Sequence, residues 1–208
     1  MKKAAFLLVV AVRLAVEVVA NAQQPVKKLP GIGFLSTAAA SNQSAVIVAI
    51  RDGLHKLGYV EGQNIAFHYG LAGGQNDQLP ALAAELVRLG VDVIVADSTL
   101  AAHPAKAAAK TIPIVILSGD PVGTGLVASL SRPGGNVTGV ANLSPDLSTK
   151  RLEVLKESIP GVDRIAVLWD PEGPVPLLAF KEIMEASRGL GLQIQSLEVR
   201  GPEPDIEG

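Results

Sequence analysis

The chain has 208 residues, of which 48% are hydrophobic and 3% aromatic, and its formal net charge at pH 7 is −2. It contains no cysteine, which excludes disulfides, thiol catalysis and cysteine-ligated zinc. Lysine and arginine form no cluster outside the N-terminus, so the basic footprint of a nucleic-acid-binding protein is absent. A chain of this length can bury the core of one domain, or of one domain and part of a second.

The N-terminus has the pattern of a secretory signal peptide. A basic start is followed by a long apolar stretch, and residues 20–22 form an A-x-A cleavage site. A short membrane anchor is the alternative, and the charges of Arg13 and Glu17 within the apolar stretch make it less attractive. We therefore expect an exported protein from which residues 1–22 are removed.

From residue 30 onward, short β-rich runs alternate with amphipathic runs of helical period. Strands are expected at residues 31–36, 64–70, 91–97, 112–118 and 136–142, and helices at residues 41–58, 76–90 and 99–110. Five strands at this spacing, with nearly continuous apolar sequences, predict a doubly wound parallel sheet with right-handed crossovers. After the fourth strand we expect a helix of about two turns and then a Pro-Gly-Gly-Asn turn.

The alternation continues beyond the fifth strand. Ser144 is the predicted N-cap of a further helix, with Pro145 at its first position. A strand at 164–170, a loop at 171–176, a helix through residues 179–190 and a last strand at 192–200 are expected to follow. With only two strands, this second sheet would be small and its edges exposed.

One motif suggests a nucleotide site. Residues 123–128 read Gly-Thr-Gly-Leu-Val-Ala, which formally satisfies the dinucleotide-binding pattern G-x-G-x-x-A. In that fold the first glycine lies at the strand end and a full helix follows. Here residues 119–122 lie between the strand and the first glycine, and Arg132 and Pro133 end the following helix after only about two turns. The motif fails in its context, although an enzyme that uses a nucleotide or sugar phosphate remains the alternative function.

The sequence offers no catalytic residues. It lacks the phosphate loop G-x-x-x-x-G-K-[ST] and the nucleophile motif G-x-S-x-G. Its three histidines, His55, His68 and His103, show no spacing typical of metal ligands. We therefore predict no catalytic residue, no metal site and no cofactor.

Position in the sheet indicates where a ligand would bind. In open α/β sheets, ligands lie beyond the carboxyl ends of the strands. The residues expected there are Ser36, Thr37, Ser98, Thr99, Gly119 and Asp120, with Trp169 at the end of the sixth strand. Hydroxyls that lead into helices leave free N–H groups for a carboxylate, Asp120 could offset an ammonium, and Trp169 could cover a ligand. Ordinary capping and turn chemistry explain the hydroxyl residues equally well, and a core position explains Trp169.

Four long blocks carry a family resemblance. They read GLHKLGYVEGQNIAFHY, LPALAAELVRLGVDVIVA, TIPIVILSGDPVGTGLVASLSRPGGNVTGV and LSTKRLEVLKESIPGVDRIAVLWDP. In this order they resemble the ABC-transporter substrate-binding proteins of the tryptophan/tyrosine type, from about residue 30 to about residue 201. The resemblance implies a periplasmic-binding-protein fold of type I, in which two Rossmann-like lobes joined by a hinge close on a small ligand.

The resemblance also implies a role. The protein would be a periplasmic monomer without enzymatic activity or cofactor that captures a small amino-acid-like solute, aromatic or otherwise hydrophobic, and delivers it to an ABC permease in the membrane. Residues 23–142 would form the N-terminal lobe and residues 143–208 part of the C-terminal lobe, which would contribute Trp169 and Asp170 to the cleft. Residues 138–142 would belong to the hinge.

Family members are longer, so the second Rossmann-like lobe would be incomplete here. The chain would then be a fragment, the product of a truncated gene or a non-functional remnant. A sensor module that kept the binding fold and lost transport is a further alternative.

Overall fold

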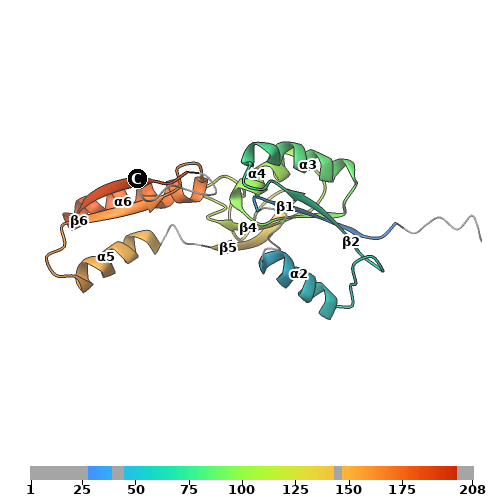
Figure 1. Cartoon of the computed structure of the whole chain (residues 1–208), viewed down its shortest axis with the longest axis horizontal. Helices are drawn as coiled ribbons and strands as arrows, with labels where there is room; N and C mark the ends of the chain where they lie inside the picture. The colour runs from blue at the N-terminus through green and yellow to red at the C-terminus, as the bar shows by residue number, and fades with distance from the viewer. Residues whose placement is uncertain (1–27, 39–44, 143–146, 201–208) are drawn as a thin grey trace, which may run out of the picture.

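The computed structural model describes residues 28–38, 45–142 and 147–200. The predicted signal peptide, the predicted cap at Ser144 and Pro145, and residues 201–208 lie outside this part. Two units follow one another along the long axis of the molecule (Figure 1). Residues 31–142 contain a five-stranded sheet and residues 147–200 a two-stranded sheet, and we name the units after these sheets. None of the described helices is long and apolar enough to cross a membrane.

The sheet of the five-stranded unit is wholly parallel. Its strands are β1 Gly31–Ser36, β2 Ala66–Leu71, β3 Val93–Ala96, β4 Ile114–Gly119 and β5 Val137–Asn142. Their order in the sheet is β2-β1-β3-β4-β5, and every neighbouring pair is parallel. All six residues of β1 are buried, because the strand has neighbours on both sides and helices over both faces.

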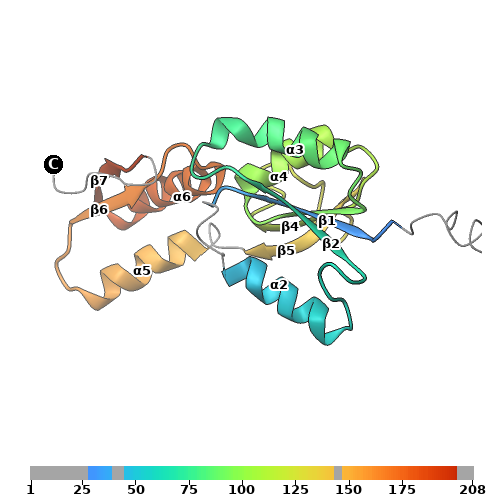
Figure 2. The same ribbon diagram turned by 45° about the vertical axis from the view of Figure 1, so that its right-hand side comes forward.

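Helices cover the two faces of this sheet. They are α2 Ala45–Lys56, α3 Leu79–Arg88 and α4 Thr99–Ala108, and a short 3₁₀ turn at Asn76–Gln78 precedes α3. Helices α3 and α4 lie on one face and α2 on the other (Figures 1 and 2). The buried side chains accordingly form two clusters, one under α3 and α4 and a smaller one that includes Ile47 of α2.

Three aromatic rings stack at the cluster on the α2 face. The ring centroids of Phe34, Phe67 and Tyr69 lie 5.9 to 6.2 Å apart. Phe34 is completely buried, whereas Tyr69 lies on the edge strand and is 41% exposed. The rings therefore link the buried strand β1 to the edge strand β2.

The two-stranded unit consists of α5 Ser148–Ser158, β6 Arg164–Trp169, α6 Pro174–Leu190 and β7 Gln193–Glu198. Strands β6 and β7 are parallel, and the described residues pair no further strand with either of them. Leu168 of β6 is 62% exposed and Leu197 of β7 is 40% exposed. The prediction of a small sheet with exposed edges is therefore confirmed.

The prediction of a helix directly after β4 is wrong. Residues 121–132 form successive turns and bends without a helix. The turns begin where the Gly123 N–H donates to Asp120 Oδ1 at 2.8 Å, and Gly125 adopts a φ of +75°. The ammonium of Lys106 donates to the carbonyls of Gly125 and Leu126, at 3.2 and 2.8 Å. Local hydrogen bonds, together with those from Lys106, a residue distant in sequence, thus replace the backbone hydrogen bonds of a helix.

The predicted loop at residues 171–176 ends too late, because α6 already begins at Pro174. Proline suits the first helical position, where no N–H is needed. Strand ends differ from prediction by smaller amounts: β2 begins at Ala66 and β3 spans only Val93–Ala96.

Candidate functional site

A cavity of about 610 Å³ lies between the two units. The five-stranded unit contributes residues from the carboxyl ends of β3, β4 and β5 and from the start of α4, and the two-stranded unit contributes the segment that follows β6. The lining residues are Asp97, Ser98, Thr99, Leu100, Leu117, Ser118, Gly119, Val140, Asn142, Asp170, Gly173, Pro174, Val175 and Pro176.

Asp97 presents a carboxyl group at the end of β3 and lines the cavity. Its Oδ2 accepts a hydrogen bond of 2.6 Å from the hydroxyl of Ser36, which is fully buried at the end of β1. The Ser36 hydroxyl in turn accepts from the Ala38 N–H at 3.0 Å. Ser36 therefore lies behind Asp97 and orients it.

Burial dominates the electrostatics of Asp97. Desolvation raises the pKa of its carboxyl, while the Ser36 hydroxyl and the N–H groups of Asp97 itself and of Thr37 lower the pKa by less. Among the described residues, Oδ1 of Asp97 is buried and has no partner with hydrogen-bond geometry.

Ser98 and Thr99 place the N-terminus of α4 at the cavity. Ser98 is the N-cap, and its hydroxyl accepts from the Ala101 N–H at 3.2 Å. Thr99 is buried, and its hydroxyl lies 2.7 Å from that of Ser118 on β4. One of the free N–H groups of the first turn is therefore satisfied by the cap, and the others remain for a ligand or water.

Gly119 and Asp120 differ in their positions. Gly119 lines the cavity, whereas Asp120 does not. Asp120 has a φ of +41° and accepts from the Gly123 N–H, so its carboxylate closes a turn of its own chain. This geometry also argues against a phosphate at residues 123–128, because a carboxylate already occupies one of the N–H groups of the glycine pattern.

The two site residues predicted from the two-stranded unit also differ in their positions. Asp170 lines the cavity, but Trp169 does not. The indole of Trp169 stacks on Phe180 with ring centroids 4.2 Å apart and planes 3° apart, and its Nε1–H donates to the Ser196 hydroxyl at 2.9 Å. Ser36 and Thr37 are likewise absent from the lining.

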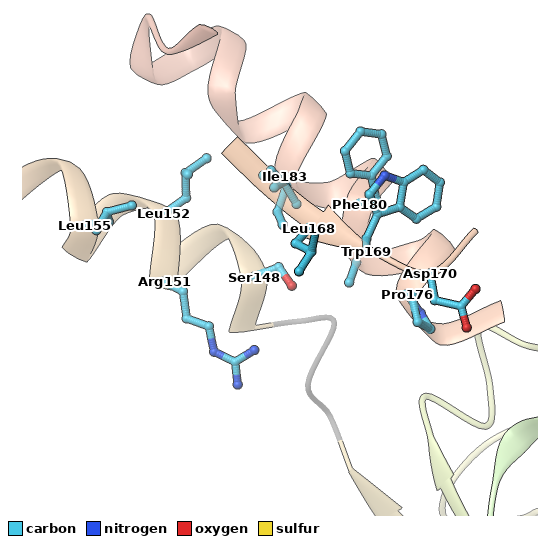
Figure 3. Close-up of a pocket in the computed structure, with 12 residues that line it drawn as sticks. Ser148, Arg151, Leu152, Leu155, Leu168, Trp169, Asp170, Pro176, Phe180 and Ile183 are labelled. Atoms are coloured by element: carbon cyan, nitrogen blue, oxygen red, sulfur yellow. The ribbon is translucent and has the colours of Figure 1, made fainter. Parts of the chain in front are cut away.

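Trp169 belongs to a second hollow, an apolar groove of about 500 Å³ between α5, β6 and α6. Figure 3 shows Leu152 and Leu155 of α5 on one side of Leu168, and the stacked rings of Trp169 and Phe180 on the other. The groove lies within a single unit, whereas the cavity is built from both units and gathers polar strand ends. The cavity is therefore the candidate site.

The charged side chains that line the cavity all carry the same sign. Asp97 and Asp170 lie in the lining, one from each unit, and no Lys, Arg or His of the described chain joins them. Such a surface favours a ligand that carries a cationic group. Apolar residues complete the wall, namely Leu100, Leu117, Val140, Pro174, Val175 and Pro176. No group of three potential metal ligands occurs in the described ranges.

Sequence reasoning missed several lining residues. Asp97 is the last residue of the predicted third strand and precedes Ser98, so the argument from strand ends could have included it. Ser118 is the last residue of the predicted fourth strand, so the same argument could have included it as well. Residues 174–176 were placed in a loop, and their role at the cavity depends on how the units are arranged.

The family model of the ABC transporter substrate binding proteins matches residues 37–203. The chain belongs to this family. Its fold is the type I periplasmic-binding fold, as the resemblance implied, and the described residues form a five-stranded parallel sheet in one unit and a two-stranded parallel sheet in the other.

Three similar proteins illustrate the relationship. A tyrosine-binding protein of Clostridioides difficile is 38% identical over 119 residues, which are 56% of this chain and 34% of that protein. The crystal structure of a conserved domain protein from Vibrio cholerae is 31% identical with a TM-score of 0.73, covering 82% of this chain and 57% of the other. An ABC domain from Streptococcus pneumoniae in complex with L-Trp is 27% identical with a TM-score of 0.71, covering 83% and 58%. The chain thus spans little more than half the length of these solved structures.

Proposed function

We propose that this protein is the solute-binding component of an ABC uptake system and captures a small amino-acid-like solute in the cavity between its two units. The observation that carries the proposal is the cavity itself, which gathers the carboxyl ends of β3, β4 and β5 and faces Asp170 of the second unit. The tyrosine-binding relative and the relative in complex with L-Trp support an amino acid as the ligand.

The lining offers a partner for each part of an amino acid. The N-terminus of α4, with the N-cap Ser98, suits the carboxylate. Asp97 and Asp170 suit the ammonium, in place of Asp120, which the structure keeps in its own turn. The apolar wall of the cavity suits a hydrophobic side chain.

The two units would act as the two lobes, divided between residues 142 and 143, with residues 138–142 as part of the hinge. Ligand binding would favour the closed arrangement, which a permease in the membrane then recognises. In this role the protein is a periplasmic monomer after removal of residues 1–22, and it needs no cofactor and catalyses no reaction.

The test is a thermal-shift screen of the full chain against the natural L-amino acids, followed by calorimetry. At least one amino acid is expected to stabilise the protein. Replacing Asp97→Asn is expected to weaken its binding by at least about tenfold, because a charge-assisted hydrogen bond is lost. The matched variant Asp52→Asn changes an exposed residue of α2 away from the cavity and is expected to bind normally.

Two results would contradict the proposal: no amino acid shifts the melting temperature at millimolar concentration, or Asp97→Asn binds as tightly as the unaltered chain. Tryptamine, which lacks the carboxylate, and N-acetyl-tryptophan, which lacks the ammonium, separate the two polar contacts. A site that holds the ammonium through carboxylates is expected to reject N-acetyl-tryptophan more strongly than tryptamine.

A further inference from the structure

The two units touch at Gly119, the last residue of β4. A Cβ atom built on Gly119 would lie 2.8 Å from Cγ1 and 3.2 Å from Cγ2 of Val175, which belongs to α6 of the other unit. The next neighbour, the Asn142 carbonyl oxygen, would be at an ordinary contact distance of 3.5 Å. Gly119 does not have a positive φ, so its backbone would accept alanine. Val175 is therefore the steric reason for a glycine at this position.

The start of α6 holds Val175 firmly. Prolines flank it on both sides, and Pro174 is the first residue of the helix. The N-cap Gly173 is buried, and a Cβ there would lie 2.9 Å from Cδ of Pro176. With fixed φ angles on both sides and a packed N-cap, the backbone cannot readily move Val175 aside.

The end of β4, which faces Val175, is equally fixed. Gly119 pairs with Asn142 of β5, and the following N–H, that of Asp120, donates to the Asn142 carbonyl at 3.1 Å. The rigid end of β4 thus meets the rigid start of α6. The two residues in contact, Gly119 and Val175, both line the cavity.

We propose that the contact between Val175 and Gly119 sets how closely the two units approach, and that the Val175 side chain, which lines the cavity, also limits the size of the ligand that the cavity admits. The first half of this inference concerns the approach of the units and stands on the packing alone. The second half rests on the proposed function, because it requires a ligand in the cavity.

The experiment exchanges the sizes of the two side chains. Gly119→Ala adds a methyl group where Val175 leaves no space, Val175→Ala makes space, and the double variant combines them. The matched control is Gly53→Ala in α2, where an added Cβ meets nothing within 4 Å. Because the chain has no cysteine, Lys56→Cys in α2 and Glu185→Cys in α6 allow one spin label on each unit without background labelling.

The distance between the labels, measured by pulsed electron paramagnetic resonance without ligand, tests the first half. We expect Gly119→Ala to shift it to longer values, the double variant to return it to that of the parent, and Gly53→Ala to leave it unchanged. An unchanged distance in Gly119→Ala, or a failure of Val175→Ala to restore it, would overturn the inference. This readout does not depend on whether any amino acid binds.

Calorimetry with L-Trp, L-Tyr and L-Leu tests the second half. Gly119→Ala is expected to lose at least about tenfold in affinity for the best ligand, and the double variant to recover most of it, because methyl-sized clashes and gaps have effects of this order. Val175→Ala alone removes two methyl groups from the cavity lining, and we therefore expect it to shift the preference toward the larger side chains. If the double variant regains the label distance but the preference among ligands never changes, Val175 does not determine ligand size. If the unaltered chain binds none of the three ligands or of the other amino acids, the proposed function fails, while the label distances still decide the contact.

Discussion

Replacing Ser36→Ala removes the hydroxyl that holds the carboxyl group of Asp97. In the structure this hydroxyl donates to Asp97 Oδ2 at 2.6 Å and accepts from the Ala38 N–H at 3.0 Å, and Ser36 is fully buried. A hydrogen bond to a charged group contributes about 1.5–3 kcal/mol, and a neutral one about 0.5–1.5 kcal/mol. We therefore expect the variant to lose about 2–4 kcal/mol of unfolding free energy near neutral pH.

The loss should depend on pH in a defined direction. Desolvation raises the pKa of Asp97 in the folded protein above its unfolded value, so ionisation of this group destabilises the fold. The contribution of the protonated group is complete below the unfolded pKa and is lost as the pH rises through the folded pKa. The Ser36 hydroxyl lowers the folded pKa, so its removal raises that pKa further and enlarges the loss on the alkaline side.

Urea unfolding at about pH 4 and about pH 8 measures this difference. The loss of unfolding free energy caused by Ser36→Ala is expected to be larger at the higher pH. When Asp97→Asn is also present, most of the pH dependence of this loss should disappear. Ser158→Ala, which removes an exposed hydroxyl on α5, is the matched control and should change stability little at either pH. An equal penalty at both pH values would refute the assignment of Ser36 as the partner of an ionised Asp97.

Three further variants test the framework around the site. Phe34→Ala removes a fully buried ring and should cost about 3–5 kcal/mol in urea unfolding, whereas a loss below about 1 kcal/mol would contradict the aromatic stack. Lys106→Met removes the ammonium that holds two loop carbonyls, and limited proteolysis should then cut within residues 121–132 faster than in the parent. Gly139→Ala would place a Cβ 2.0 Å from the Ile116 carbonyl oxygen at a φ of +152°, so circular dichroism should show loss of cooperative unfolding, in contrast to a normal melt for Gly53→Ala.

The sequence predicted the elements of the fold well because their signals are local. Each strand of the first sheet is a short apolar run, and each helix repeats apolar residues at its own period, so even the small second sheet was expected. The segment after β4 was misjudged because its residues have no strong preference of their own. Its conformation depends on Asp120, which bonds to a neighbouring amide, and on Lys106, which is distant in sequence.

The candidate site was predictable in its location but less so in its members. Ser98, Thr99, Gly119 and Asp170 were expected at strand ends and line the cavity. Trp169 was also expected there, but ring stacking on a helix of its own unit turns it into the groove. Which of two adjacent side chains faces a cavity depends on the packing of both units, and that packing leaves no mark in a local sequence pattern.

The stacked indole of Trp169 gives the protein an optical label of its own. It is the only tryptophan in the chain, and it lies in the two-stranded unit, whereas both tyrosines, Tyr59 and Tyr69, lie in the five-stranded unit. Emission excited at the red edge of the absorption band therefore follows the stack on Phe180, and tyrosine emission follows the larger sheet. Unfolding recorded in the two channels can distinguish a chain that melts as one cooperative block from one whose smaller unit opens first.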